Sequence, residues 1–281
     1  MEDRKLTERH ITAYAQSLRG EERAAATIEK YLHAVRTFSA WLDGRSVTKE
    51  LSAQWKAELL KVGLSPTTVN GRLSAVNGLF RFLGWEECRV KFLKLQRKAF
   101  RDASRELTRT EYERLLSAAG SRGRRDLELL METICGAGIR VSEVKYITVE
   151  AAERGQAEIR LKGKIRTILL SEKLCRKLLR YARKQKIASG AIFRAESGQP
   201  LSRFQVWRRM KNLCAAAGVE PSKVFPHNLR HLFAVTFYRA TRDIVKLADL
   251  LGHSSIDTTR IYLRTTGREH VRQLERLGLV S

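Results

Sequence analysis

Apolar residues in the first ninety positions recur every three or four residues, which is the spacing of an α-helix with one buried face. Between positions 27 and 42 these residues are Ile28, Tyr31, Leu32, Val35, Phe38, Trp41 and Leu42. A second helix is predicted to start at Pro66 with Ser65 as its N-cap, because proline suits the first helical position and serine suits the cap. The pattern therefore predicts an all-α N-terminal domain.

After position 107 the pattern mixes helices with one pair of strands. Thr108 and Glu111 form a capping box that opens a helix, and a later helix ends at the glycines of 136–138. Short strands are predicted at 157–161 and 165–170, with a turn at 162–164. Further helices are predicted at 172–187, at 203–217 between Ser202 and Gly218, from Pro226, and at 244–251. Ser254 or Ser255 can cap a last short helix, which contains Tyr262. We expect a mainly α fold with a small β-hairpin, an α+β class in two domains.

A basic segment separates the two patterns. Positions 89–101 hold six cations, and the first acid after them is Asp102. In an arbitrary protein this composition favours a solvated surface, but in so basic a chain it predicts a linker that lies along a phosphate backbone. The expected boundaries are 1–95 for the helical domain, 96–106 for the linker, and 107–281 for the second domain with its C-terminal tail helix.

The net charge of the chain is its most informative property of composition. Lys and Arg number 54 against 30 Asp and Glu, so the net charge is +24 and the pI is about 10.4. Such an excess predicts a polyanionic partner, with nucleic acid ahead of an anionic membrane surface. A membrane is disfavoured, because no run of eighteen apolar residues exists and the first five residues do not resemble a signal peptide.

The cysteines are Cys88, Cys135, Cys175 and Cys214. Because they are scattered singly, they indicate neither a zinc site nor a disulfide framework. We expect a protein of the reducing cytosol.

The richest chemistry lies between His227 and Tyr262. The chain reads His227-Asn228-Leu229-Arg230-His231, then Leu251-Gly252-His253, and places Tyr262 nine residues after that histidine. Phosphoryl transfer needs a cation, a proton carrier and a nucleophile, and all three types are present without a metal motif. We therefore predict a tyrosine that attacks DNA. Two ordinary helix histidines are the alternative, and a metal pair is disfavoured because Asn228 stands where zinc proteases have Glu.

A second candidate anion site surrounds Arg140. The sequence Gly138-Ile139-Arg140 bends the chain before a predicted helix, and a helix N-terminus with an arginine suits an anion. Glu143 is spaced to hold Arg140, although a surface ion pair would show the same spacing. Lys162 and Lys164 at the hairpin turn are by default solvated.

Taken together, these motifs resemble the tyrosine recombinase (phage integrase) family. The matching segments occur in family order: the Gly138–Glu143 box, Lys162-Gly163 in a hairpin, His227 with Arg230, Leu251-Gly252-His253, and Tyr262. The hairpin is one residue shorter than is usual, so Lys164 stays an alternative to Lys162. The N-terminal helices resemble the core-binding domain of the family.

The resemblance implies a mechanism. Tyr262 would attack a DNA phosphodiester to give a 3′-phosphotyrosyl enzyme and a free 5′-hydroxyl. His227 would be the base, Lys162 the general acid, and Arg140, Arg230 and His253 would stabilise the phosphorane. No cofactor and no metal are expected for the chemistry.

The resemblance also implies partners. We expect double-stranded DNA with specific recombination sites, a homotetramer that forms a Holliday junction, and optional accessory DNA-bending or directionality factors in the bacterial nucleoid. The size resembles Xer-type or mobile-element recombinases that integrate or excise DNA. The tail with Val271, Leu274, Leu277 and Leu279 would dock either on a neighbouring protomer or on its own domain.

Two other functions fit parts of the sequence. A type IB topoisomerase shares the active-site chemistry, but the compact two-domain organisation disfavours it. A non-catalytic regulator would use residues 244–262 as a helix-turn-helix, and this function leaves Arg140, Arg230 and His227 without a joint purpose.

Overall fold

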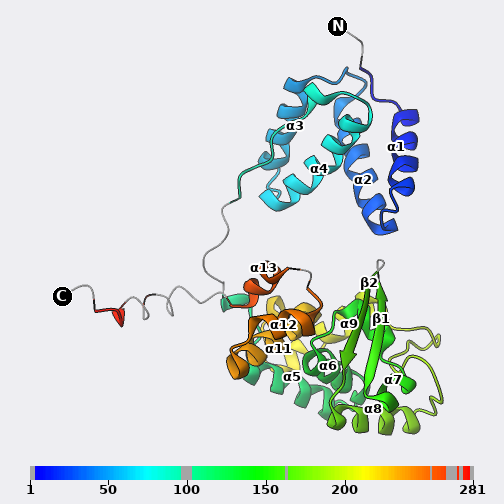
Figure 1. Ribbon diagram of the computed structural model, residues 1–281, viewed down its shortest axis with the longest axis vertical. Coiled ribbons are helices and arrows are strands. Elements are labelled where there is room, and N and C mark those ends of the chain that lie inside the picture. The colour runs from blue at the N-terminus through cyan, green and yellow to red at the C-terminus, as the bar shows by residue number, and fades with distance from the viewer. Residues whose placement is uncertain are drawn as a thin grey trace. The chain divides into compact units, whose positions relative to one another are not determined.

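The computed structural model describes residues 4–95, 103–161, 164–253, 255–263, 271 and 275–278. The chain divides into two compact units, Met1–Arg97 and Lys98–Ser281 (Figure 1). The mainly α fold with one small two-stranded sheet is confirmed. The finer boundaries at 95, 96–106 and 107 stay a prediction, since most of the expected linker lies outside the described residues.

The first unit is helical, as its apolar pattern predicted. Its elements are α1 (Glu8–Gly20), α2 (Ala25–Leu42), α3 (Lys49–Lys61), α4 (Pro66–Phe82) and the 3-10 turn η1 (Glu86–Cys88). Ser65 caps α4 by accepting a hydrogen bond from the Thr68 amide. Aromatic rings fill the core: the Phe38 ring centroid lies 4.9 Å from that of Trp55 and 5.8 Å from that of Phe80.

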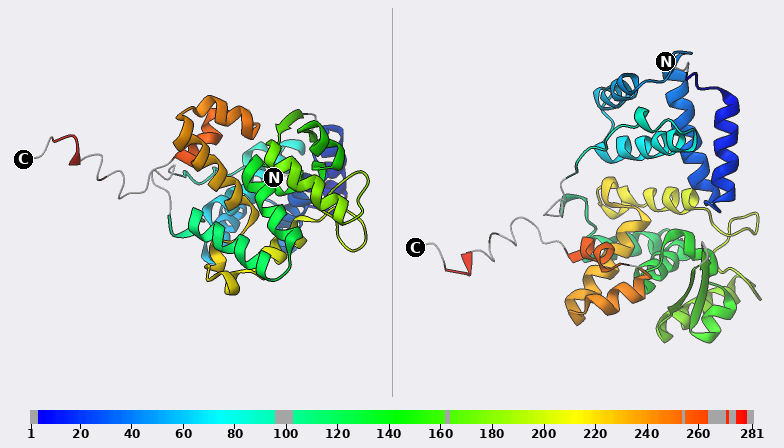
Figure 2. Two further views of the ribbon diagram at one scale, coloured as in Figure 1. Left: turned by 90° about the horizontal axis from the view of Figure 1, so that it is seen from below. Right: turned by 45° about the horizontal axis from the view of Figure 1, so that its top comes forward.

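The second unit contains the predicted hairpin within a set of helices (Figures 1 and 2). In chain order its elements are η2 (Ala103–Arg105), α5 (Arg109–Ser121), α6 (Arg125–Ala137), η3 (Val141–Tyr146), α7 (Val149–Arg154), β1 (Gln156–Leu161), β2 (Lys164–Leu169), α8 (Glu172–Lys184), α9 (Arg203–Lys211), α10 (Cys214–Ala217), η4 (Pro221–Lys223), α11 (Pro226–Thr241), α12 (Ile244–Leu251), α13 (Ile256–Thr259) and η5 (Arg260–Leu263).

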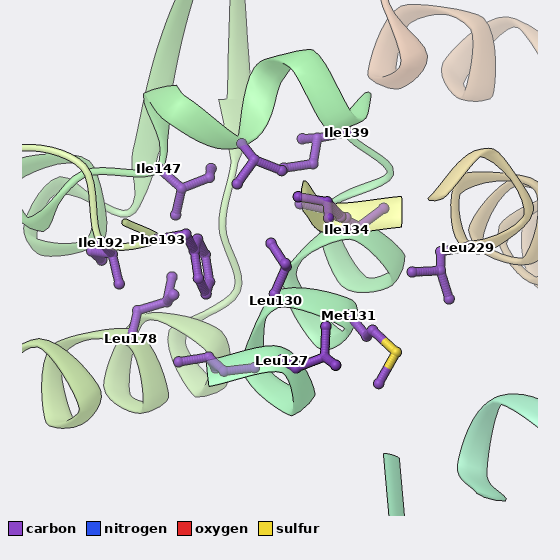
Figure 3. Packing of buried hydrophobic residues seen from close by; sticks show 14 of the residues in the cluster. Leu127, Leu130, Met131, Ile134, Ile139, Ile147, Leu178, Ile192, Phe193 and Leu229 are labelled. Atoms are coloured by element: carbon purple, nitrogen blue, oxygen red, sulfur yellow. The ribbon is translucent and has the colours of Figure 1, made fainter. Parts of the chain in front are cut away.

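Helix α6 lies at the centre of the core of this unit (Figure 3). Its residues Leu127, Leu130, Met131 and Ile134 are each at most 1% exposed. A smaller cluster joins Ala234 of α11 and Leu247 and Leu251 of α12 to Tyr262. The cluster holds Tyr262 against α11 through apolar contacts.

The hairpin pairs β1 and β2 antiparallel, with Ile159 opposite Arg166 and Leu161 opposite Lys164. The predicted three-residue turn was wrong at its last position, because Lys164 is already paired and begins β2. Alternation places Ala157, Ile159 and Ile168 on the buried side of the sheet. Lys162 and Gly163 lie outside the described residues.

Three helix predictions were wrong in detail. The helix expected at 203–217 is two helices, and the Asn212 carbonyl between them accepts a hydrogen bond of 3.0 Å from Arg122 Nη1. The segment after Arg140 is 3-10 and not α. Ser255 caps α13, which ends at Thr259, so Tyr262 lies in η5 and not in an α-helix.

Candidate active site

The Gly138 bend brings Arg140 to the surface. Gly138 ends α6 with φ of +61°, and a Cβ there would lie 2.4 Å from Phe233 Cδ1. The chain therefore reverses where only glycine fits, and Arg140 becomes the N-cap of η3. The Glu143 carboxylate accepts hydrogen bonds from the Arg140 backbone amide at 2.7 Å and from Arg140 Nη1 at 2.9 Å. The Arg140 side chain is 44% exposed, so an anion in solution can reach it.

Three guanidiniums surround the single carboxylate of Glu143. Arg140 Nη1 lies 2.9 Å, Arg166 Nη2 3.5 Å and Arg230 Nη1 3.9 Å from its oxygens. The Glu143 side chain is only 3% exposed, so water screens these charges little. Three positive charges against one negative charge leave the cluster electropositive, which favours a bound phosphate.

Arg230 is held rigidly from α11. Its Nη1 donates to the Gly138 carbonyl at 2.7 Å, and its Nη2 donates to the Leu251 carbonyl at 2.8 Å. The side chain is 2% exposed. Burial and then repulsion by Arg140 lower the pKa of Arg230. Such fixed donors need little reorganisation when charge develops nearby.

His253 bridges Arg230 and α13. Its Nε2 lies 3.0 Å from Arg230 Nη2, and its Nδ1 lies 2.8 Å from Thr259 Oγ1. Because a guanidinium only donates, Nε2 accepts and the proton belongs on Nδ1, where it is donated to Thr259. Burial and the charges of Arg230 and Arg140 lower the pKa of His253 to about 4. The ring is therefore neutral at neutral pH.

Tyr262 lies among three imidazoles. Its ring centroid is 5.2 Å from that of His231, 6.0 Å from that of His253 and 6.3 Å from that of His227. Only 6% of Tyr262 is exposed. The Tyr262 side chain also interacts with Arg230, and this interaction partly offsets the lowering of the Arg230 pKa by burial.

His227 is suited to proton transfer. Burial lowers its pKa first, followed by the charges of His231 and Arg230. The neutral imidazole, which is the form that can take a proton, is therefore favoured at neutral pH. His231, one turn further along α11, has its Nε2 3.3 Å from Glu106 Oε1.

The structure thus brings together five of the residues that the sequence predicted: Arg140, His227, Arg230, His253 and Tyr262. Lys162 lies outside the described residues, as does the Lys164 side chain. Sequence reasoning missed Arg166, Thr259 and Glu106 as neighbours of the site. The basic residues of the hairpin could have pointed to Arg166, whereas no sequence motif marks Thr259 or Glu106. Among the described residues no group of three His, Cys, Asp or Glu is placed to hold a metal ion, and no helix is long and apolar enough to cross a membrane.

Comparison with known proteins gives one consistent family. Residues 105–269 match the phage integrase family, and residues 11–87 match the N-terminal SAM-like domain of phage integrases. Tyrosine recombinase XerA of Pyrococcus furiosus is 29% identical over 288 residues, which cover 100% of this chain and 98% of the relative. XerA of Thermococcus kodakarensis is 31% identical over 262 residues, which cover 91% of this chain and 90% of the relative.

A solved structure shows the same fold. The XerH site-specific recombinase, bound to a palindromic difH substrate in a post-cleavage complex, aligns with a TM-score of 0.73 at 20% identity and covers 92% of this chain and 81% of that one. The family match extends over more than half of the 281 residues. The chain therefore belongs to the phage integrase family of tyrosine recombinases, enzymes that cleave and rejoin DNA.

Proposed function

We propose that this recombinase acts at specific DNA sites with Tyr262 as its nucleophile. The Tyr262 Oη attacks the scissile phosphorus, the bond to the 5′-oxygen breaks, and a 3′-phosphotyrosyl enzyme and a free 5′-hydroxyl result. The observation that carries the proposal is the convergence of Tyr262 with Arg230 and three imidazoles around an electropositive cluster. Attack by a 5′-hydroxyl from another strand reverses the step, so no external energy source is needed.

The role proposed for each side chain follows from its surroundings in the site. A tyrosine hydroxyl must lose its proton to attack phosphorus, and His227, whose ring centroid lies 6.3 Å from that of Tyr262, is the neutral imidazole proposed to take it. Arg140 and Arg230 bind the non-bridging oxygens of the phosphate. His253 donates to the same oxygens only after its Nε2 gains a proton or its ring turns, because Arg230 now donates to Nε2. Loss of one such donor typically costs ~10²–10³ in rate.

The leaving 5′-oxygen needs a proton donor. A lysine at the end of the β1–β2 hairpin is proposed for this role, with Lys162 preferred because it precedes the glycine and Lys164 as the alternative. Comparing Lys162→Ala with Lys164→Ala assigns the acid to one of them.

Four protomers on two duplexes, with strand exchange in pairs through a Holliday junction, are proposed for the complete reaction. A similar protein supports the DNA-binding part of the proposal, since XerH has been solved on its difH substrate in a post-cleavage complex. The net charge of +24 suits binding to two duplexes. Action in the cytoplasm on nucleoid DNA, with optional accessory factors, belongs to the same proposal.

Covalent trapping tests the nucleophile. On a nicked suicide substrate the wild-type chain should accumulate a protein–DNA adduct, and Tyr262→Phe should form none while binding DNA with unchanged affinity. Tyr238→Phe is the matched control, because Tyr238 packs against the same small cluster and should keep the adduct. If Tyr262→Phe still forms an adduct, another residue is the nucleophile. If the wild-type chain binds DNA but forms no adduct, the result favours a non-catalytic regulator.

A further inference from the structure

Arg166 of β2 connects the hairpin to the active site. We propose that Arg166 is a positioning residue for strand cleavage: it joins the base of the hairpin to the turn at 251–253 and so sets where the hairpin lysine meets the leaving 5′-oxygen. The inference rests on the proposed function, which gives the general acid to a lysine of this hairpin.

The contacts of Arg166 reach two other elements. Its Nη1 donates to the carbonyl of Leu251 at the end of α12, and its Nη2 lies 3.5 Å from Glu143 Oε2 in η3. Arg166 is paired opposite Ile159, whose side chain is buried, so both belong to the inner face of the hairpin. One side chain thus joins β2, η3 and the end of α12.

The turn that follows Leu251 is shaped around Arg166. Gly252 has φ of +62°, and a Cβ at this position would lie 2.2 Å from Arg166 Cδ. The backbone of the turn therefore lies directly against the stem of the arginine. The Leu251 carbonyl accepts hydrogen bonds from both Arg166 and Arg230, one residue before Gly252 and two before His253. The hairpin and the phosphate-binding arginine consequently share one anchor.

Arg166 differs from Arg140 in exposure. The Arg166 side chain is 13% exposed with its Nη atoms directed at protein oxygens, whereas the Arg140 side chain is 44% exposed. Arg166 is therefore placed to orient other groups and Arg140 to bind substrate. A lysine cannot replace the arginine fully, since its single ammonium lacks the planar fork that reaches two acceptors.

The distance along the chain between the anchor and the proposed acid is short. Lys162 stands four residues before Arg166, and Lys164 stands two residues before it. A misplacement of about 1 Å in a reacting group costs ~10²-fold in rate. Loss of the Arg166 anchor should therefore appear mainly in proton donation to the leaving group.

The test compares two leaving groups in single-turnover cleavage by the full chain. One suicide substrate carries the ordinary 5′-oxygen, and the other carries a 5′-bridging sulfur, which leaves without a proton. Arg166→Ala should lower the rate about 10²-fold on the oxygen substrate and be largely rescued on the sulfur substrate. Arg140→Ala should be slow on both, because phosphate binding is needed for either leaving group. Arg176→Ala, which removes an arginine that is 69% exposed on α8, should change neither rate.

Two results overturn the inference: equal losses on both substrates, or no loss on either. If Arg166→Ala lowers the melting temperature or the DNA affinity, Arg166→Lys provides the comparison, because it keeps the charge and stem and should show the same rescue in weaker form. Failure of the proposed function is distinguishable, since wild type would then form no adduct with either substrate.

Discussion

The pairing of His253 explains its protonation state. Arg230 donates to Nε2 while Nδ1 faces Thr259, and the ring lies within a cluster where three guanidiniums surround the Glu143 carboxylate. A protonated His253 would add a fourth positive charge beside Arg230. The site therefore favours neutral imidazole until a phosphate arrives with negative charge.

The lowered pKa of His253 predicts a pH dependence of stability. The unfolded imidazole titrates near 6.5, whereas the folded one titrates at about 4. Between these values the unfolded chain binds a proton that the folded chain excludes, so stability falls as pH falls through this window, and the loss is complete below about pH 4. In His253→Gln this part of the dependence should disappear, leaving the contribution of His227, whose pKa is also lowered.

Urea unfolding at several pH values between 7 and 4 measures this effect. His33→Gln is the control, because His33 is exposed on α2 and its replacement should leave the slope unchanged. A slope in His253→Gln equal to that of the wild type would contradict the pairing with Arg230.

The role of a residue could be predicted from the sequence where the residue stands in a motif. It could not be predicted where it depends on a contact between distant parts of the chain. Arg140, Arg230 and Tyr262 stand in patterns whose residue types already indicate phosphoryl transfer. Arg166 contacts Leu251 across 85 positions, a pairing that no local pattern encodes. Nothing in the sequence around Thr259 marks it as a neighbour of the site, and only the structure shows its contact with His253.

At the scale of elements, the turn after α12 depends on glycine for two reasons. Gly252 adopts a left-handed conformation, and the Arg166 stem occupies the space of a side chain. Gly252→Ala should lose about 1–2 kcal/mol for the backbone conformation and roughly 1–3 kcal/mol more for overpacking, with slower DNA cleavage.

Gly198→Ala is the matched control. Gly198 also has positive φ, +77°, but nothing lies within 4 Å of its Cβ position. It should therefore lose only the backbone contribution, and the difference in the free energy of unfolding between the two variants isolates the contact with Arg166. Equal losses would mean that Arg166 moves aside without cost.

Element prediction succeeded where a local signal marks the start of a helix. Thr108, Ser202 and Pro226 each begin a helix as their types predict. The break at Asn212 was missed because its carbonyl accepts a hydrogen bond from Arg122, which is 90 positions away. The 3-10 turn that carries Tyr262 was likewise invisible, since the apolar spacing of a short turn resembles that of an α-helix.

At the scale of the whole molecule, composition predicted the kind of partner and the fold determines where the chemistry lies. The excess of 24 positive charges indicated nucleic acid. Each unit has its own apolar core, one around Phe38 and one around Leu130. Every described site residue belongs to the second unit. The tail prediction falls mostly outside the described residues, and Val271 and Leu277 are exposed.

Tyr262 lies beside the arginine and histidines of its own chain, so the proposed nucleophile and the groups proposed to assist it come from a single polypeptide. In genetic terms, Tyr262→Phe and Arg230→Ala should fail to complement. Subunits of the two variants mixed on one DNA substrate should give no adduct. When either variant is mixed with wild type, only the wild-type subunits should form an adduct. An adduct from the doubly defective mixture would mean that subunits exchange the tyrosine. Without exchange, a defective allele should be dominant under the proposed assembly of four protomers, because one inactive member would prevent strand cleavage in pairs.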